Sequence, residues 1–200
     1  MTLRMTHIRE QLAVRQLEPV VDFDGDRAAV AMIFREVDHE PEILLIRRAD
    51  CEGDPWSGHI AFPGGRVDPT DVSTQATAER ETLEEIGLDL QQHGQCIAAL
   101  EPEFPVRRAS LRGIQVTPYV YTLDDEPETY TLNHEVADLY WVSIRPMLRH
   151  QTVTQFDFEH EGRVMTFPGF DVNGQTLWGM SFRMLNRLFI AVDADFRPLI

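Results

Sequence analysis

The fold is decided by two adjacent stretches, Gly64-Gly65-Arg66-Val67-Asp68-Pro69-Thr70-Asp71 and Arg80-Glu81-Thr82-Leu83-Glu84-Glu85-Ile86-Gly87-Leu88. The first is a glycine-rich turn with acidic side chains. The second predicts a helix that starts after an N-cap at Ser73 or Thr74 and ends at Gly87, where a left-handed residue is favoured. At about 100° per residue, Glu81, Glu84 and Glu85 fall on one face of this helix.

Three carboxylates on one face are unfavourable for a helix by itself. Like charges at i,i+4 cost about 0.2–0.5 kcal/mol per exposed pair, and two charges about 4 Å apart interact by roughly 4 kcal/mol at an effective dielectric near 20. A divalent cation reverses the sign of this interaction, and carboxylate oxygens suit Mg²⁺ or Mn²⁺ better than Zn²⁺. The alternative to a metal site is an acidic helix face that is simply solvated. The glycine turn with acidic side chains just upstream argues for the metal site.

The two stretches together resemble the signature of the Nudix hydrolases. That signature reads Gly, five residues, Glu, seven residues, Arg-Glu, an aliphatic residue, any residue, Glu-Glu, any residue, Gly and an aliphatic residue. The Arg-Glu and Glu-Glu half is intact from Arg80 to Leu88. Asp71 stands in place of the first Glu, the spacer before Arg80 is one residue longer, and Thr82 replaces the usual aliphatic residue.

The resemblance implies an α/β (α+β) fold, an α/β/α sandwich with a mixed sheet between helices. It also implies a divalent-metal-dependent hydrolase that cleaves the diphosphate of a nucleoside diphosphate linked to another group. Mg²⁺ or Mn²⁺ would be held by Glu81, Glu84 and Glu85, with a carbonyl of Gly64 or Gly65 as a further ligand. Arg80 resembles the arginine that pairs with a glutamate of the signature and holds its rotamer.

The general base is left open between a glutamate of the signature and an acid from a later loop. Glu135 is the candidate from a later loop, because it lies in Asn133-His134-Glu135-Val136 just before a predicted strand. An exposed loop glutamate without a catalytic role is the alternative reading of the same residue.

Two stretches resemble the coenzyme A pyrophosphatase branch of the family. They are Gly58-His59-Ile60-Ala61-Phe62-Pro63-Gly64-Gly65 and Leu177-Trp178-Gly179-Met180-Ser181-Phe182-Arg183. Asp68-Pro69-Thr70-Asp71 matches the longer loop of that branch. Ile46 and Asp54 depart from it, because the branch usually has Thr and Arg at these positions. On the two matching stretches, coenzyme A or a derivative is the first choice of substrate. The departures at Ile46 and Asp54 favour the alternative, which is an NDP-sugar, ADP-ribose or a nucleotide.

Arginines are the candidate clamps for the substrate's phosphates. These residues are Arg47, Arg48, Arg107, Arg108 and Arg112, of which the last three lie in a stretch between two predicted strands. Each one alone is more often a solvated surface charge. The third hypothesis for the function of the chain is a non-catalytic binding module on the same fold. The retained Glu84-Glu85 pair argues against it.

Composition narrows the class of partner. The chain has 200 residues, 43% of them hydrophobic, and a net charge of −15, which argues against a nucleic acid polymer and an anionic membrane as partners. Cys51 and Cys96 show no CxxC spacing, so a reducing compartment is expected. No apolar run reaches the ~18 residues of a membrane span, and the start lacks the apolar block of a signal peptide. We expect a cytoplasmic protein with a small nucleotide-type substrate, and the resemblance is compatible with a homodimer.

Apolar runs and turn residues predict the other elements. The run over 28–34 predicts a buried central strand, with residues 42–48 as its antiparallel partner. Further strands are expected at 59–62, 96–100, 114–121 and 138–142, a hairpin over 156–167, and a last amphipathic helix over 176–192. A helix near 5–17 would belong to an N-terminal helical extension, residues 1–27, and residues 28–200 would form the Nudix domain.

Overall fold

The computed structural model describes residues 3–13, 23, 25–53, 56–105, 113–160 and 162–199. Its elements, in chain order, are α1 (Met5–Ala13), β1 (Asp26–Val37), β2 (Glu40–Arg48), β3 (Ile60–Ala61), β4 (Gly64–Arg66), α2 (Thr74–Ile86), α3 (Leu90–His93), β5 (Gly94–Ala99), β6 (Ile114–Leu123), β7 (Val136–Ser143), α4 (Ile144–Leu148), β8 (Val153–His160), β9 (Arg163–Val172), β10 (Gln175–Trp178) and α5 (Gly179–Val192). None of the helices in these ranges is long and apolar enough to cross a membrane.

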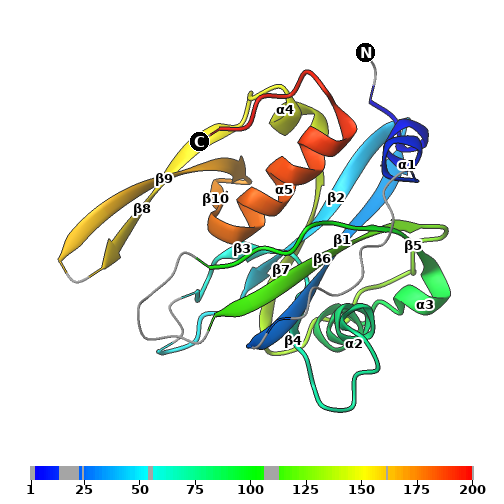
Figure 1. Ribbon diagram of the computed structural model, residues 1–200, viewed down its shortest axis with the longest axis horizontal. Helices are drawn as coiled ribbons and strands as arrows, with labels where there is room; N and C mark the ends of the chain where they lie inside the picture. The colour runs from blue at the N-terminus through cyan, green and yellow to red at the C-terminus, as the bar shows by residue number, and fades with distance from the viewer. Residues whose placement is uncertain are drawn as a thin grey trace.

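A seven-stranded mixed sheet forms the centre of the molecule. Its main path runs β3-β2-β1-β6-β5, with β4 paired to β1 and β7 paired to β2. The β1–β6 pair is parallel, whereas β1 pairs with β2 and β4 in antiparallel register. Figure 1 shows α1 and α5 on one face of this sheet and α2 with α3 on the other. The predicted α/β/α sandwich around a mixed sheet is confirmed.

The sequence of β1 explains why both faces of the sheet are covered. Ala29, Ala31 and Ile33 pack in the cluster on the α2 side, together with Ala78 and Ile86 of that helix. The alternate residues of β1, Ala28, Met32 and Phe34, pack in the cluster on the α5 side. Because successive side chains of a strand point to opposite faces, a strand buried on both faces is apolar without interruption. The predicted central strand and its antiparallel partner are confirmed, with Phe34 opposite Ile43.

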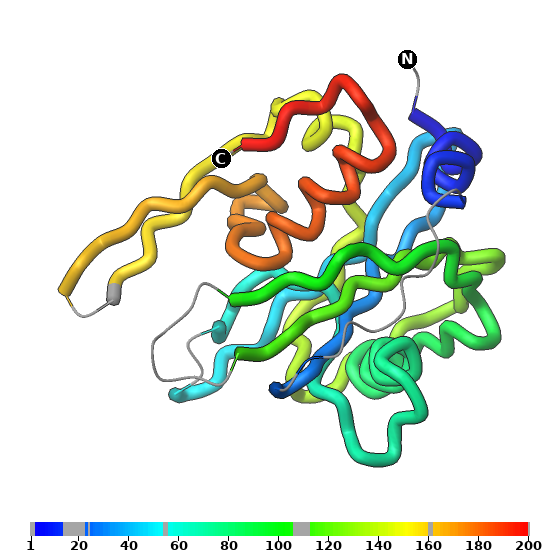
Figure 2. The backbone as a smooth tube through the Cα atoms, in the orientation of Figure 1, coloured from blue at the N-terminus to red at the C-terminus, as the bar shows by residue number. Residues whose placement is uncertain are grey.

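A second, three-stranded sheet of order β10-β9-β8 lies beside the first. Its β8–β9 hairpin extends away from the rest of the molecule (Figure 2). The predicted hairpin is confirmed and is longer than expected, since its pairing runs from Val153 opposite Phe170 to His160 opposite Arg163.

The predicted last helix begins later than expected. Residues 176–178 belong to strand β10, which pairs with β9, and α5 begins only at Gly179. Gly179 has φ +65°, a left-handed conformation that separates the strand from the helix. Leu177 is still buried, although it packs from a strand and not from a helix. The apolar side chains of residues 176–178 and of α5 follow one helical period. The backbone of residues 176–178 nevertheless pairs with β9 and forms a strand.

Helix α1 packs against α5 and β5 through Met5, Ile8 and Leu12. It ends at Ala13 in the described residues, so the expected continuation to residue 17 lies outside them. The division of the chain into an extension, 1–27, and a domain, 28–200, stays a prediction.

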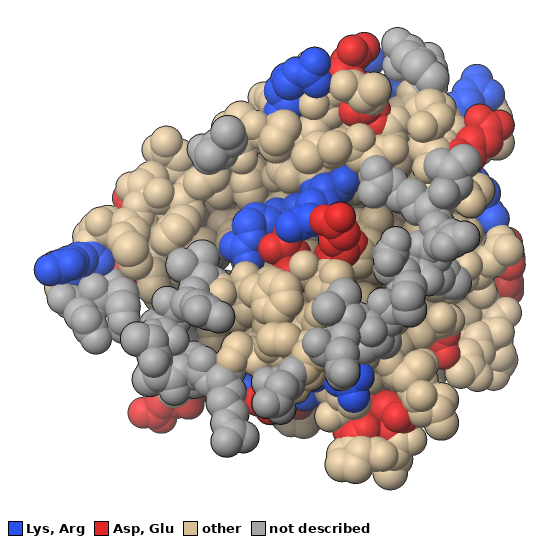
Figure 3. Space-filling view, viewed as in Figure 1, with Lys and Arg blue, Asp and Glu red and all other residues tan. Residues whose placement is uncertain are grey.

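Ion pairs fix α5 over the segment that follows β5. Figure 3 shows basic and acidic side chains side by side at the centre of the view. Arg183 Nε donates to Glu103 Oε2 at 3.0 Å, and Arg187 pairs with both Glu103 and Glu101. The backbone of Glu103 in turn pairs with Val116 of β6. The buried carboxylate of Glu103 therefore ties the helix to the sheet.

Packing of α5 gives a direct test of the core. Leu188 is fully buried between α5 and the sheet, whereas Ile190 of the same helix is 48% exposed. We expect Leu188→Ala to lower the free energy of unfolding by about 2–5 kcal/mol, because it removes buried methyl groups and leaves a cavity. Ile190→Ala is the matched control and should cost less than ~0.5 kcal/mol. Urea unfolding of both variants measures the difference, and equal losses would contradict this packing.

Candidate active site

Helix α2 begins and ends as its sequence predicts. The Ser73 side chain accepts a hydrogen bond from Ala76 N–H at 3.1 Å and is the N-cap, and Gly87 ends the helix with φ +71°. Thr82, the departure from the family signature, is fully buried and donates to the Ala78 carbonyl at 2.7 Å. Its hydroxyl is therefore satisfied inside the helix, and the methyl group packs in place of an aliphatic side chain.

The three glutamates of α2 have different surroundings. Glu84 has a side chain 54% exposed, that of Glu81 is 17% exposed, and the residue Glu85 is only 2% exposed. Burial raises the pKa of Glu81 and raises that of Glu85 to about 8. Gly64 N–H donates to Glu85 Oε2 at 2.9 Å and partly offsets the cost of burial.

Two glycines bring β4 close to this acidic face. Gly64 has φ +149°, and a Cβ there would lie 2.2 Å from the Ala29 carbonyl oxygen of β1. A Cβ at Gly65 would lie 2.4 Å from the carboxyl carbon of Glu81. Both positions require glycine for a close approach, one toward the sheet and one toward the helix.

Arg80 connects the glycine turn to the helix. Its guanidinium donates to both carboxylate oxygens of Asp71 at 2.9 and 3.0 Å, to Glu81 at 2.9 Å and to Glu84 at 3.1 Å. It also donates to the Arg66 carbonyl at 3.1 Å. The structure thus brings together the arginine and two of the glutamates that the sequence singled out, in the arrangement of a rotamer-holding contact.

Asp71, whose contribution the sequence leaves open, is the anchor of Arg80. It is almost completely buried and accepts further hydrogen bonds from Thr77 Oγ1 at 2.8 Å and Asp68 N–H at 2.9 Å. The hydrogen bonds from Arg80 lower the pKa of Asp71, so its carboxylate stays ionised. This carboxylate thus holds Arg80, which in turn donates to Glu81 and Glu84 of the acidic face.

Glu135 lies near the acidic face because its segment closes the end of α2. Thr131 N–H donates to the Ile86 carbonyl at 3.0 Å, and Asn133 N–H donates to the Glu85 carbonyl at 2.9 Å. These bonds satisfy carbonyls that a helix C-terminus leaves free. The charge of Glu135 contributes to the raised pKa of both Glu81 and Glu85, and its own side chain is half exposed.

The candidate phosphate clamps are only partly within the described residues. Arg47 Nε donates to Asp138 at 2.7 Å and its Nη1 lies 3.8 Å from Asp50. The charge of Arg48 lowers the pKa of Glu85, so it lies on the same side as the acidic face. Arg107, Arg108 and Arg112 lie outside the described residues.

A polar network on the back of α2, which the sequence analysis did not identify, holds the helix on the sheet. Tyr121 Oη donates to Glu79 at 2.8 Å, and Gln75 and Gln91 donate to the same carboxylate. Tyr119 and Thr74 share a hydrogen bond of 2.6 Å. In the sequence these tyrosines read only as strand residues, so no local pattern reveals the network.

The oxygen atoms of Glu81, Glu84, Glu85 and Gly65 are suitable ligands for a hard divalent cation. The three carboxylates do not, however, point toward one common position. Carboxylate oxygens and a glycine carbonyl are suitable ligands, and a cation would offset the desolvation that raises the pKa of Glu81 and Glu85. Arg80, however, donates to Glu81 and Glu84 as the side chains stand. Within the described ranges, no three acidic, histidine or cysteine side chains form a group that could hold an ion.

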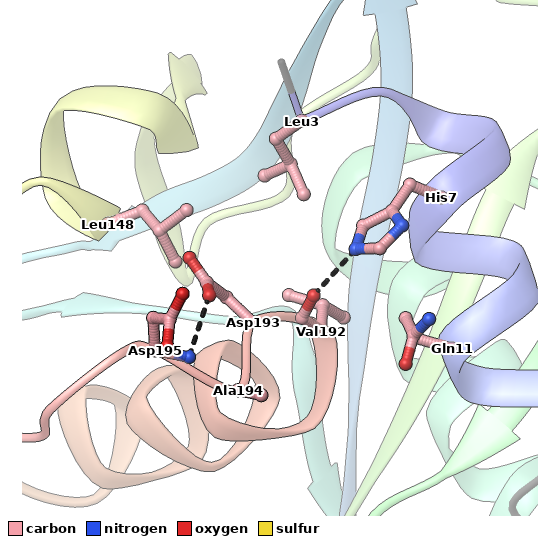
Figure 4. A pocket seen from close by; sticks show the side chains of 8 residues that line it. All are labelled: Leu3, His7, Gln11, Leu148, Val192, Asp193, Ala194 and Asp195. Atoms are coloured by element: carbon pink, nitrogen blue, oxygen red, sulfur yellow. Dashed lines mark hydrogen bonds between the residues drawn. The ribbon is translucent and has the colours of Figure 1, made fainter. Parts of the chain in front are cut away.

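A hollow of about 210 Å³ lies elsewhere, on the α5 side of the sheet. Figure 4 shows it between α1, α4 and the end of α5, with His7 Nε2 2.8 Å from the Val192 carbonyl oxygen. None of the candidate site residues lines it. The acidic face of α2 remains the candidate active site.

The contact between Asp71 and Arg80 predicts a pH-dependent stability. Asp71→Asn should lower the unfolding free energy at neutral pH by about 1–3 kcal/mol, the range for hydrogen bonds to charged groups. Because Asp71 has a lowered pKa in the folded chain, this contribution is present above its unfolded pKa of about 4 and is lost as the pH falls toward the folded pKa.

Urea unfolding at neutral pH and near pH 3 measures this contribution. The difference between wild type and variant should shrink at the lower pH. Asp195→Asn, at an exposed aspartate, is the control and should change little at either pH. A difference for Asp71→Asn that does not change with pH would contradict the pairing.

Comparisons with known proteins show the family to which the chain belongs. The model of the NUDIX domain family matches residues 25–160. An uncharacterized protein of Schizosaccharomyces pombe is 30% identical over 168 residues, which are 79% of this chain and 47% of that protein, so the chain spans about half the length of this relative. The uncharacterized Nudix hydrolase NudL of Yersinia enterocolitica is 31% identical over 149 residues, 74% of this chain and 73% of that protein.

Solved structures share the fold. The C. elegans Ap4A hydrolase in a binary complex has a TM-score of 0.50 and 24% identity, covering 62% of this chain and 84% of that one. A Nudix hydrolase from Alicyclobacillus acidocaldarius has a TM-score of 0.51 and 18% identity, covering 65% and 84%. The family model and the relatives, together with the intact signature on α2, lead to one conclusion: the chain belongs to the Nudix hydrolases.

Proposed function

We propose that the chain is a divalent-metal-dependent diphosphatase of nucleoside diphosphates linked to another group, with coenzyme A or a derivative as its first-choice substrate. The observation that carries the proposal is the acidic face of α2, where Glu81 and Glu85 lie beside the glycines of β4 and Arg80 donates to Glu81 and Glu84. Hydrolases of this family generally use divalent metal ions.

The proposed roles follow from these contacts. Glu81, Glu84, Glu85 and the Gly65 carbonyl would hold Mg²⁺ or Mn²⁺. When bound, such an ion neutralises phosphate charge and lowers the pKa of a coordinated water. Arg80 keeps the glutamates in position, and Arg47 and Arg48, with Arg107, Arg108 and Arg112, would bind phosphate oxygens. Glu135 would take the proton of the attacking water on its carboxylate, since its half-exposed side chain lies near enough to the acidic face for its charge to act on Glu81 and Glu85.

Support for coenzyme A comes from the two stretches that resemble that branch of the family. They lie about 120 residues apart in the sequence and are in contact in space, because the His59 ring lies 5.1 Å from the Trp178 ring. An NDP-sugar, ADP-ribose or a nucleotide is the alternative substrate, and Ile46, which is fully buried and offers no hydroxyl, is the observation that favours it.

Removing one carboxylate charge tests the mechanism. We expect Glu84→Gln and Glu85→Gln each to lower turnover by about 100-fold or more, in the range for lost electrostatic or proton-transfer groups. The folded state should persist, as judged by circular dichroism. Glu10→Gln, at an exposed position of α1, is the control. Turnover like that of the wild type in both variants would remove the mechanism.

A substrate panel with Mg²⁺ and with Mn²⁺ identifies the preferred substrate. It contains coenzyme A, ADP-ribose, an NDP-sugar, a nucleoside triphosphate and Ap4A, with phosphate or nucleotide release as the readout. Hydrolysis of coenzyme A ahead of the others supports the first choice. An NDP-sugar that is hydrolysed while coenzyme A is inert would overturn it and leave the enzyme class unchanged.

Gly65→Ala tests the close approach of β4 and α2. The added Cβ would lie 2.4 Å from the Glu81 carboxyl group, which is the flexible end of its side chain. We therefore expect little change in stability and a loss of activity of about tenfold or more, because the carboxylate is displaced. In a Glu81→Ala background, Gly65→Ala should have no further effect on activity. Additive losses would show that the glycine acts independently of Glu81.

A further inference from the structure

A group of aromatic rings lies on one face of the three-stranded sheet. The β8–β9 register places Phe156 opposite Phe167 and Phe158 opposite Met165, and β10 places Trp178 opposite Gly169. Directly opposed residues project from the same face of a sheet. We name this surface, with His59 at its edge, the aromatic face. It is formed by Phe156, Phe158, Phe167, Trp178 and His59.

The rings of the aromatic face are ordered against Trp178. Phe156 stacks on its indole at 4.2 Å with an interplanar angle of 16°, and Phe158 and Phe167 lie at 5.4 Å. The His59 ring meets Trp178 edge-on at 5.1 Å and Phe156 at 5.4 Å. These separations are those of favourable aromatic pairs.

The aromatic face is not part of the core. None of its five rings belongs to either hydrophobic cluster of the main sheet, and each is only half-buried. Its three phenylalanine rings and the indole of Trp178 lie on a sheet whose hairpin extends from the molecule (Figure 2). A group of partly exposed aromatic rings outside the core is a candidate binding surface.

The aromatic face is continuous with the proposed active site. The His59 carbonyl accepts from Arg48 N–H at 3.0 Å, and the charge of Arg48 acts on Glu85. His59 is followed by β3 and then by Gly64, whose N–H bonds to Glu85. Gly64 lies five positions after His59, so the two Cα atoms are at most about 17 Å apart. A single substrate molecule is of this scale.

The side chains of the aromatic face indicate which class of ligand it can bind. The acids of β8, Asp157 and Glu159, alternate with the phenylalanines and so project from the opposite face of the hairpin. Where β8 forms it, the aromatic face therefore offers flat π-surfaces without a carboxylate of that strand among them, and Asp171 of β9 lies on the same face two residues beyond Gly169. Stacking on aromatic rings is how proteins hold nucleobases without reading their edges.

We infer that the aromatic face binds the nucleobase of the substrate while the acidic face of α2 acts on its diphosphate. This inference rests on the proposed function and extends it by assigning the base to Trp178, Phe156 and Phe158. Substrates that carry a base are then preferred over diphosphates that lack one, whatever group is linked to the far phosphate.

Nuclear magnetic resonance of the wild-type chain tests base binding without any turnover. The chain has three tryptophans, Trp56, Trp141 and Trp178, so three indole N–H signals are expected. Loss of one signal in Trp178→Phe assigns it. We expect ADP to shift the Trp178 signal, and inorganic pyrophosphate at the same concentration to leave it unchanged. The signal of Trp141, on β7, is the internal reference. No shift with ADP, or an equal shift with pyrophosphate, would overturn the inference.

Steady-state kinetics give the second measurement. Trp178→Leu and Phe158→Leu should raise KM for the best nucleotide substrate about tenfold, in line with the loss of one stacked base, with kcat changed less than about threefold. Val164→Ala is the matched control, because Val164 is 64% exposed on the opposite face of the same hairpin. Unchanged KM in both leucine variants would reject the aromatic face and leave the hydrolase standing. Absence of hydrolysis across the whole panel would reject the proposed function, and the indole signals would still decide base binding.

Discussion

The contacts of Arg80 are the interaction on which the acidic site depends. Carboxylates placed about 4 Å apart repel by roughly 4 kcal/mol at the effective dielectric of a partly buried site. The guanidinium of Arg80 offsets this repulsion by donating at once to Asp71, Glu81 and Glu84. Because Asp71 is buried and holds Arg80 by two hydrogen bonds, the arginine is fixed to the turn and the glutamates are fixed to the arginine.

Glu85 is stabilised in a different way. It lies beneath the acidic face, accepts from Gly64 N–H, and has a pKa raised to about 8 by burial. In the chain by itself, burial therefore favours the protonated form of this carboxyl group. The site thus combines carboxylates whose charge Arg80 balances with one whose charged form is disfavoured by burial, and a bound cation would stabilise the charged form of each.

Helix α2 holds this arrangement because it is fastened on three sides. The glycines of β4 contact its acidic face, the segment before β7 closes its C-terminus, and Tyr121 with Glu79 fixes its back to the sheet. On a chain with a net charge of −15, phosphates also need local cations. All 18 basic residues are arginines, whose planar side chains can bind a phosphate through two hydrogen bonds.

By itself, the sequence determined the features that depend on neighbouring residues. The acidic face of α2, its cap at Ser73 and its end at Gly87 follow from helical period and local backbone preference, and the buried strand β1 follows from an unbroken apolar run. The predicted start of α5 is wrong by three residues. The apolar pattern of residues 176–178 suits a helix, but these residues pair with β9 and form a strand.

Only the tertiary structure decided which distant residues meet. The Gly64–Glu85 bond joins residues 21 apart, the Tyr121–Glu79 bond joins residues 42 apart, and the contact of His59 with Trp178 joins two separate sheets. The role of Asp71 as the anchor of Arg80 belongs to the same class, since it depends on the path of the turn. Such contacts are set by strand register and by the packing of layers, and the periodicity of a sequence carries information only about one element at a time.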